Sequence, residues 1–304
     1  MAILEVKNIS KSFASLKAVD DVSFSIEEGD VLGLLGPNGA GKTTTIRMIM
    51  NIIVPDSGSV TLLKNSEENS TNLIGYLPEE RGIYRKMKLV DVLLFLAKLK
   101  EMKMHDAKEQ IDYWLERLDL IKWKKKKIEE LSKGMQQKLQ FIATILHKPK
   151  LLILDEPFLG LDPINTNLIK EIILELKAGG TTIIFSTHQM ESAEKLCNKI
   201  ILINKGKVIL SGKIGEVKES FGKRNIHLEY EGKEDFLNKN KMIKKFDNFG
   251  NYVEIQLEEN VSPQDFLKEI ISKIQIKKFE IKEPSLNDIF IESVHSQNQE
   301  DDHE

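Results

Sequence analysis

The sequence lacks the features of a secreted, thiol-rich or membrane-spanning chain. It has one cysteine, Cys197, among 304 residues, so neither an internal disulfide nor a thiol cluster for a metal can form. A reducing, cytoplasmic compartment fits this best. Apolar stretches such as 89–99 are far shorter than the roughly 20 residues of a membrane-spanning helix. Glu5 and Lys7 interrupt the first apolar stretch, so we expect no signal peptide and a membrane role only through a partner.

A surplus of one charge is also missing. The 44 Lys and Arg residues face 47 Asp and Glu residues, a formal net charge of -3. Together with 41% hydrophobic and only 7% aromatic residues, this indicates a globular chain with no overall bias toward nucleic acid. A chain of 304 residues exceeds one ordinary hydrophobic core, so we expect a large domain with a small one, or two domains.

The first 212 residues alternate short β-branched runs with helical stretches, which predicts an α/β domain. Some runs are apolar on both faces, as in strands covered on both sides of a sheet. From about 88 to 148, apolar residues recur every three or four positions, which predicts an inserted helical subdomain. The predicted strands are Leu4–Ile9, Val22–Ile26, Val31–Leu35, Ser59–Leu62, Leu151–Leu154, Thr181–Phe185 and Ile200–Ile203.

The pattern changes after Gly212. Residues 213–295 are predicted to form a small α+β domain with the order strand, helix, strand, strand, helix, strand. Ser262 is suited to cap its amphipathic helix, with Pro263 at the first helical position. Residues 296–304 lack an apolar anchor, and we expect an acidic, disordered tail.

The segment GPNGAGKT, from Gly36 to Thr43, matches the phosphate-binding pattern G-x-x-x-x-G-K-[ST] between an apolar strand and a helix. Its glycines let backbone N–H groups turn inward around a phosphate, and the helix adds its positive N-terminal end. Lys42 supplies a charge for the β- and γ-phosphates, and the Thr43 hydroxyl can ligate Mg²⁺. A chance match of this kind is expected about once in a hundred such chains. The pattern therefore predicts nucleotide binding.

The segment LLILDEP ends a predicted buried strand in two adjacent carboxylates. Asp155 is placed to hold Mg²⁺ beside a phosphate loop, and Glu156 to polarise an attacking water as a general base. Alone, such a pair is weak evidence, because acidic residues are common in helix caps and turns. Together with the phosphate loop, the pair becomes strong evidence for a metal ligand and a general base.

Two further segments are candidates for binding a phosphate. Ser132 is a natural helix N-cap and Gly134 leaves the backbone bare, so this helix start offers a second anion site. On this segment alone an ordinary capped helix is the favoured interpretation. His188 ends a predicted strand where it could hydrogen-bond a γ-phosphate, although a lone histidine is usually structural.

Taken in order along residues 2–212, these motifs resemble the ATP-binding subunit of an ABC transporter. The resemblance implies an α/β P-loop NTPase core of the ABC ATPase type, with ATP and Mg²⁺ as cofactors. It also implies Glu156 as general base, His188 as switch histidine and Phe13 stacked on adenine, where a packed core aromatic would otherwise be favoured. The nucleotide-binding residues that it implies are Phe13, Gly36, Pro37, Asn38, Gly39, Ala40, Gly41, Lys42, Thr43, Thr44, Ser132, Gly134 and Asp162, and the metal-binding residues are Thr43, Glu79 and Asp155.

The chain departs from the family pattern in its signature and after the GYLP run. The usual signature is Leu-Ser-Gly-Gly-Gln, and here Lys133 and Met135 replace a glycine and the glutamine. A glutamine is usual where this chain has Glu79. A carboxylate can bind Mg²⁺ or water but cannot donate an amide hydrogen bond.

The resemblance implies the ATPase subunit of a transporter at the cytoplasmic face of the membrane, working as a dimer on a separate polytopic permease. The segment 283–292, EPSLNDIFIE, resembles the accessory domain of a sodium-efflux and drug- or peptide-export branch, which implies export. One alternative is a soluble ABC-type ATPase acting on nucleic acid or ribosomes. The chain has neither a second cassette nor a long coiled coil, and its charge balance argues against a phosphate-binding surface. A small-molecule phosphotransferase would leave the signature and the second domain unexplained.

Overall fold

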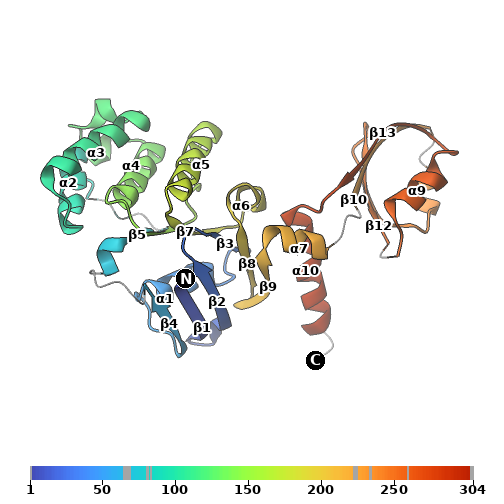
Figure 1. Cartoon of the computed structure of the whole chain (residues 1–304), viewed down its shortest axis with the longest axis horizontal. Helices are drawn as coiled ribbons and strands as arrows, with labels where there is room; N and C mark the ends of the chain where they lie inside the picture. Colours follow the sequence, from blue (N-terminus) through green and yellow to red (C-terminus); the bar gives the residue numbers. More distant parts are fainter. Residues whose placement is uncertain are drawn as a thin grey trace. The chain divides into compact units, whose positions relative to one another are not determined.

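The structure is a computed structural model that describes residues 2–63, 70–79, 82, 84–221, 225–232, 235–258 and 260–301. It divides into two compact units, Met1–Gly212 and Lys213–Glu304 (Figure 1). No helix in the described ranges has the length and apolar character needed to cross a bilayer.

A six-stranded sheet is the centre of the first unit. Its strand order is β5-β6-β7-β3-β8-β9, and the neighbours from β5 through β8 run parallel. Every residue of β3, β6 and β7 is buried, as expected for strands covered on both faces. The carboxyl ends of parallel strands meet at one edge, where α/β sheets bind ligands. The strands are β3 (Val31–Leu35), β5 (Ile74–Leu77), β6 (Leu151–Asp155), β7 (Thr182–Thr187), β8 (Lys199–Asn204) and β9 (Lys207–Lys213).

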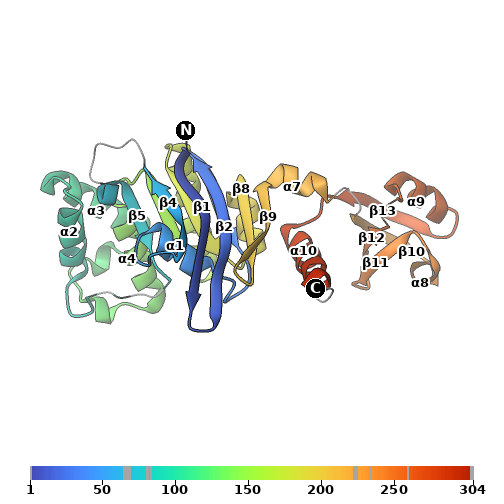
Figure 2. The ribbon, with the colours of Figure 1, turned by 90° about the horizontal axis from the view of Figure 1, so that it is seen from below.

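A separate antiparallel sheet, ordered β2-β1-β4, covers this core together with α1. The sequence predicts its strands but not their separation into a second sheet. Ile46, Met48 and Ile49 of α1 belong to a core cluster with residues of both sheets. Figure 2 shows the long β1–β2 pair. The elements are β1 (Ala2–Phe13), β2 (Leu16–Glu27), α1 (Lys42–Ile49) and β4 (Ser57–Leu62).

The inserted subdomain is helical, as predicted. Between Lys88 and Lys148, all of which the structure describes, the only β pairing is an isolated bridge from Lys88 to Lys127. The helices α2, α3 and α4 contact one another (Figure 1). The helical elements of the first unit after α1 are η1 (Ser70–Leu73), α2 (Leu89–Leu99), α3 (Met104–Arg117), η2 (Ile121–Trp123), η3 (Ile128–Glu130), α4 (Lys133–Ile145), α5 (Pro163–Ala178) and α6 (Met190–Leu196).

The second unit contains a four-stranded antiparallel sheet ordered β11-β12-β10-β13. Its elements from β10 to β13 follow the order strand, helix, strand, strand, helix, strand, the ferredoxin-like arrangement. Side chains of α8 and α9, including Phe236 and Phe266, pack on one face of the sheet. The elements are α7 (Ile214–Ser220), β10 (Asn225–Glu231), α8 (Asp235–Lys239), β11 (Ile243–Asn248), β12 (Val253–Leu257), α9 (Pro263–Ile270), β13 (Gln275–Lys282) and α10 (Leu286–Asp301).

The last helix corrects one expectation. We expect a disordered tail at 296–304, but α10 continues through Asp301; residues 302–304 lie outside the described residues. Once a helix is nucleated, each added residue gains a backbone hydrogen bond at little further cost, and Gln and Glu are good helix formers. A polar segment can therefore prolong a helix that begins on apolar contacts such as Leu286 and Ile289, both buried.

Candidate nucleotide-binding site

The phosphate loop is held in a shape that only glycine permits at two positions. Gly36 and Gly41 have φ values of 148° and 107°. A Cβ atom on Gly36 would lie 2.1 Å from the Ile203 carbonyl oxygen, and one on Gly41 would lie 2.4 Å from that of Ala18. Gly39 also has positive φ, at 80°, but a Cβ there would meet nothing within 4 Å. The loop is therefore tightly fixed at both ends and open in the middle.

Lys42 closes this loop from inside. Its ammonium group donates hydrogen bonds to the carbonyl oxygens of Gly36, at 2.8 Å, and Pro37, at 3.0 Å. It lies 3.8 Å from Glu156 Oε1, and the lysine is only 6% exposed. Burial lowers the pKa of Lys42, while the charge of Glu156 acts against this lowering. A phosphate that entered the loop would meet a positioned cation.

Three oxygen-bearing side chains converge beside the loop. Thr43 Oγ1 lies 3.2 Å from Asp155 Oδ1 and 3.3 Å from Glu79 Oε2. Burial raises the pKa of Asp155, although hydrogen bonds from Ser186 and Thr43 oppose the rise. The other oxygen of this carboxylate, Oδ2, is buried without a hydrogen-bond partner in the described part of the chain.

These oxygens fit a hard cation such as Mg²⁺, which takes carboxylate and hydroxyl ligands and keeps several waters. No group of three or more His, Cys, Asp or Glu side chains in the described residues is arranged to hold a metal. A cation between Thr43, Asp155 and Glu79 would therefore also need water or phosphate oxygens as ligands.

Glu156 lies at the turn that follows β6. Its φ of 48° is in the left-handed region, which is uncommon for a non-glycine residue and is often found at functional sites. Its Oε1 is 3.0 Å from Nδ1 of His188, at the end of β7. The carboxylate therefore lies between His188 and Lys42, whereas Asp155 contacts Thr43. The two adjacent acids have different partners.

Ser186 also belongs to the site, although the sequence alone did not predict it. Its hydroxyl donates to Asp155 Oδ1 at 2.5 Å and accepts the backbone N–H of Glu156 at 3.0 Å. It is fully buried within the apolar strand β7. A serine in such a strand, two residues before His188, is the signal that could have identified it.

We expect Ser186→Ala to lower the free energy of unfolding by about 1 to 3 kcal/mol, because it removes a hydrogen-bond donor to a buried carboxylate. ATPase activity should fall as well, since Asp155 and the Glu156 backbone lose a common anchor. Urea unfolding and phosphate release are the measurements. Ser192→Ala is the matched control, because Ser192 is also buried but donates to a neutral amide, that of Gln189. Equal stability losses in the two variants would contradict the anchoring role.

The signature segment starts α4. The Ser132 hydroxyl caps this helix by accepting the Met135 N–H at 3.2 Å, and a Cβ on Gly134 would meet nothing within 4 Å. Neither Ser132 nor Gly134 has a hydrogen bond to the phosphate loop of the same chain within the described residues. Gln137, also missed, ties α4 to the end of β6 by donating to the Pro157 carbonyl oxygen at 2.6 Å. The start of α4 is therefore fixed to the end of β6 by Gln137, while the space beside Gly134 is open.

Two other candidate residues lie in simpler surroundings. Asp162 caps α5 by accepting the Asn165 N–H at 3.0 Å, which lowers its pKa. Phe13 ends β1 with 45% of its surface exposed, and the Lys11 ammonium lies 5.8 Å from its ring centroid. It is not a packed core aromatic. Its hairpin reaches the phosphate loop through Ala18, the residue that closely approaches Gly41.

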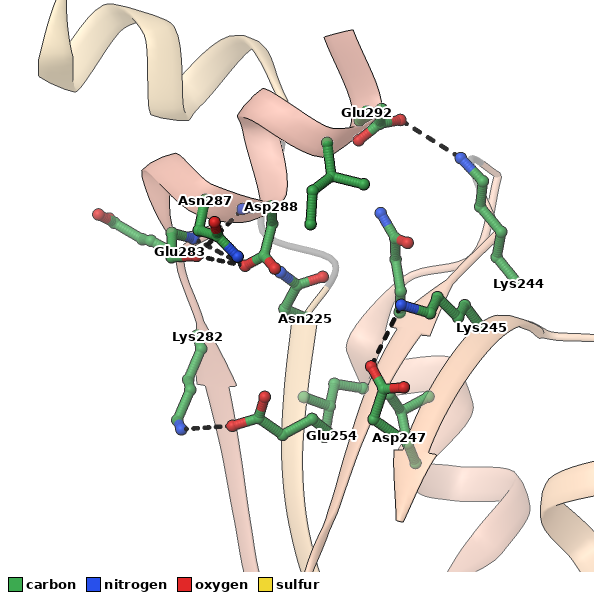
Figure 3. A pocket seen from close by; sticks show the side chains of 15 residues that line it. Asn225, Lys244, Lys245, Asp247, Glu254, Lys282, Glu283, Asn287, Asp288 and Glu292 are labelled. Carbon is green, nitrogen blue, oxygen red and sulfur yellow. Dashed lines mark hydrogen bonds and ion pairs between the residues drawn. The ribbon is translucent and has the colours of Figure 1, made fainter. Parts of the chain in front are cut away.

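The second unit has a cavity of about 810 Å³ between its open sheet face and α10 (Figure 3). Three lysines and five carboxylates line it, so its charge does not suit a triphosphate. The lysines lie in the ion pairs Lys244–Glu292, Lys245–Asp247 and Lys282–Glu254.

A glycine-fixed loop, a buried lysine and a buried aspartate at the carboxyl edge of a parallel sheet define a P-loop nucleoside triphosphatase. Residues 19–159 match the family described as "ABC transporter". Residues 212–294 match "ATP-binding protein DrrA1-3-like, C-terminal domain". The chain belongs to the ABC transporter ATP-binding family, whose members bind ATP and hydrolyse it for transport.

Relatives extend over nearly the whole chain. It is 45% identical over 297 residues to the uncharacterized ABC transporter ATP-binding protein YhaQ of Bacillus subtilis, covering 96% of this chain and 98% of that protein. It is 37% identical over 214 residues to the linearmycin resistance ATP-binding protein LnrL of the same organism, covering 69% of each. A solved ATP-binding subunit of an ABC transporter superposes with a TM-score of 0.66 at 30% identity, covering 72% of this chain and 93% of that chain.

Proposed function

We propose that this chain powers an ABC exporter by ATP-driven closure of a dimer on a membrane permease. ABC ATP-binding subunits generally pair with membrane permease components. What we propose beyond this is the direction of transport and the formation of a dimer. The observation that carries the chemistry is the convergence of Lys42, Thr43, Asp155 and Glu156 at one edge of the sheet.

In this proposal ATP lies in the loop from Gly36 to Thr44, with its phosphates on the backbone N–H groups and the N-terminus of α1. Lys42 moves from its carbonyl partners to the β- and γ-phosphates. Thr43, Asp155 and Glu79 hold Mg²⁺, which when bound neutralises charge that develops on the phosphates. Phe13, on its exposed hairpin, stacks on the adenine.

Glu156 acts as the general base. Its carboxylate accepts a proton from the attacking water. Because Glu156 contacts His188 and Lys42 whereas Asp155 contacts Thr43, one acid serves the water and the other serves the metal. His188, already 3.0 Å from Glu156, holds that carboxylate in place and hydrogen-bonds the γ-phosphate.

The second half of each site comes from another copy of the chain. Among the residues that the structure describes, Ser132 and Gly134 have no hydrogen bond to the phosphate loop of their own chain. In this proposal their open helix start covers the γ-phosphate of a second copy. We propose that Asp162, which caps α5, contacts the second copy when the dimer closes. ATP binding closes the dimer, and hydrolysis opens it.

Export and membrane attachment rest on relatives. LnrL is by name a resistance protein, and the second unit matches a DrrA-like domain. We place the chain at the cytoplasmic face of the membrane, attached through its permease. No specific observation favours the nucleic-acid alternative, and the charge of the cavity in the second unit does not suit phosphates.

Co-purification tests this assignment. A tagged chain extracted with mild detergent is expected to bring down a polytopic membrane protein whose spans have around 20 apolar residues each. Recovery of ribosomes or nucleic acid in place of a membrane protein would contradict the transporter role and favour the alternative.

We predict that a chain ending at Gly212 still binds ATP, but with weaker dimerisation or altered regulation. All the nucleotide-site residues lie within Met1–Gly212, which is compact and has its own hydrophobic core. Nucleotide affinity and light-scattering mass of the truncated and full chains are the measurements. A truncated chain that folds but fails to bind ATP would show that the second unit contributes to the site.

A further inference from the structure

Glu79 gives the metal position a second carboxylate. Both Glu79 and Asp155 approach the Thr43 hydroxyl, at 3.3 Å and 3.2 Å. One hydroxyl carries one proton and can donate to only one acceptor at a time. One of the two close carboxylate oxygens is therefore always without this hydrogen bond.

The buried side of the same position also lacks a partner. Asp155 is 1% exposed, and its Oδ2 is unpartnered among the described residues. Glu79 is exposed. The Thr43 hydroxyl therefore lies between a buried carboxylate, that of Asp155, and a carboxylate that faces solvent, that of Glu79. A cation could enter from the solvent side and satisfy both carboxylates.

The carboxylates around Thr43 favour a small, hard cation. Glu79 and Asp155 both lie within 3.3 Å of its hydroxyl, and both act, together with Glu156, on the ammonium group of Lys42. Oxygen ligands of this kind are those that Mg²⁺ and Mn²⁺ prefer. An amide at position 79 would remove one negative charge from beside the cation.

We propose that Glu79, with Asp155 and Thr43, holds a divalent cation before any nucleotide binds, so that ATP enters a site already loaded with metal. This rests on the proposed metal site and adds an order of events to it. The ion is a hard cation such as Mg²⁺ or Mn²⁺, and water completes its coordination, since the chain supplies fewer than six ligands.

The same carboxylate repels a nucleotide when the metal is absent. Without a cation, Glu79 adds a negative charge next to the place of the phosphates; with a cation, that charge is neutralised. By linkage, metal and nucleotide then increase each other's affinity by the same factor. This mutual increase should be larger with Glu79 than with glutamine.

The test compares the full-length wild-type chain with Glu79→Gln, Glu79→Asp and the control Glu116→Gln, an exposed carboxylate on α3. Electron paramagnetic resonance follows Mn²⁺ binding without nucleotide. We expect Glu79→Gln to weaken Mn²⁺ binding by about 10-fold or more, as is typical for groups that tune a metal site. Glu79→Asp keeps the charge and most of the affinity, and Glu116→Gln behaves as the wild type.

ATP binding in the presence of a chelator gives an effect of the opposite sign. Glu79→Gln should bind metal-free ATP more tightly than the wild type, because it removes a like charge. A merely structural role of Glu79 would weaken both affinities together. Circular dichroism confirms that each variant is folded.

Equal Mn²⁺ affinities in the wild type and folded Glu79→Gln overturn this inference, as does a loss of metal-free ATP affinity in that variant. If Mg-ATP still binds the wild-type chain in that case, the proposed ATP site stands. A wild-type chain that binds Mn²⁺ but not Mg-ATP would overturn the proposed function instead.

Discussion

Lys42→Ala is expected to weaken ATP binding about 10- to 150-fold, which corresponds to one charged hydrogen bond of about 1.5 to 3 kcal/mol. ATP hydrolysis should become undetectable. The substitution also leaves Glu156 and Asp155 facing the phosphates with no ammonium group between them, so like-charge repulsion adds to the loss. Isothermal titration with Mg-ATP measures the affinity.

Lys98→Ala, an exposed lysine on α2, is the charge-matched control and should leave the affinity unchanged. We expect the Lys42→Ala protein to fold, because the loop keeps its glycine-fixed ends after the substitution. Circular dichroism checks this. A folded Lys42→Ala protein with wild-type ATP affinity would mean that the nucleotide lies elsewhere.

Glu156→Gln is expected to lower the rate of ATP hydrolysis about 10²- to 10⁴-fold while ATP and Mg²⁺ still bind. The amide keeps the shape of the side chain but cannot accept the proton of the attacking water. The metal-facing Asp155 and its contacts with Thr43 and Ser186 are unchanged. Single-turnover phosphate release separates this loss from a loss of binding.

Glu175→Gln is the control, since Glu175 lies on α5 and pairs with Arg117 away from the phosphate loop. It should hydrolyse ATP at the wild-type rate. If Glu156→Gln also hydrolyses ATP at that rate, the assignment of Glu156 as general base is wrong.

The local parts of the site could be predicted from the sequence because each depends on a few adjacent residues. The GPNGAGKT segment requires glycine at Gly36 and Gly41 for its backbone path, and the structure gives both positive φ and close carbonyl contacts. The LLILDEP segment is a buried strand ending at Asp155. Such features depend only on residues that are close together in the sequence.

Contacts between distant segments could not be predicted in this way. Ser186 meets Asp155 because β7 lies next to β6, and Gln137 meets Pro157 because α4 packs near the end of that strand. The strand order that creates these contacts places β7 between β6 and β3, which no local pattern specifies. Glu79 approaches Thr43 for a similar reason.

Some elements have too weak a pattern. The strand β5 has four residues, IGYL, and gains its burial by pairing with β6, so the sequence alone does not distinguish it from a loop. In contrast, the alternation in β10 and β12 predicts a half-exposed sheet, because one face packs on Phe236 and Phe266. A short strand such as β5 forms because of the strand beside it, whereas an amphipathic strand can be recognised from its own alternating residues.

The light-scattering mass of Glu156→Gln with and without Mg-ATP decides whether two copies of the chain share one nucleotide. We expect a monomer without nucleotide and a dimer with it, because the phosphate loop of one copy and Ser132 and Gly134 of the other hold the same unhydrolysed ATP. Adding Ser132→Arg should abolish the dimer by blocking the γ-phosphate contact. A mass that Mg-ATP leaves unchanged in Glu156→Gln, despite bound nucleotide, would contradict the shared site.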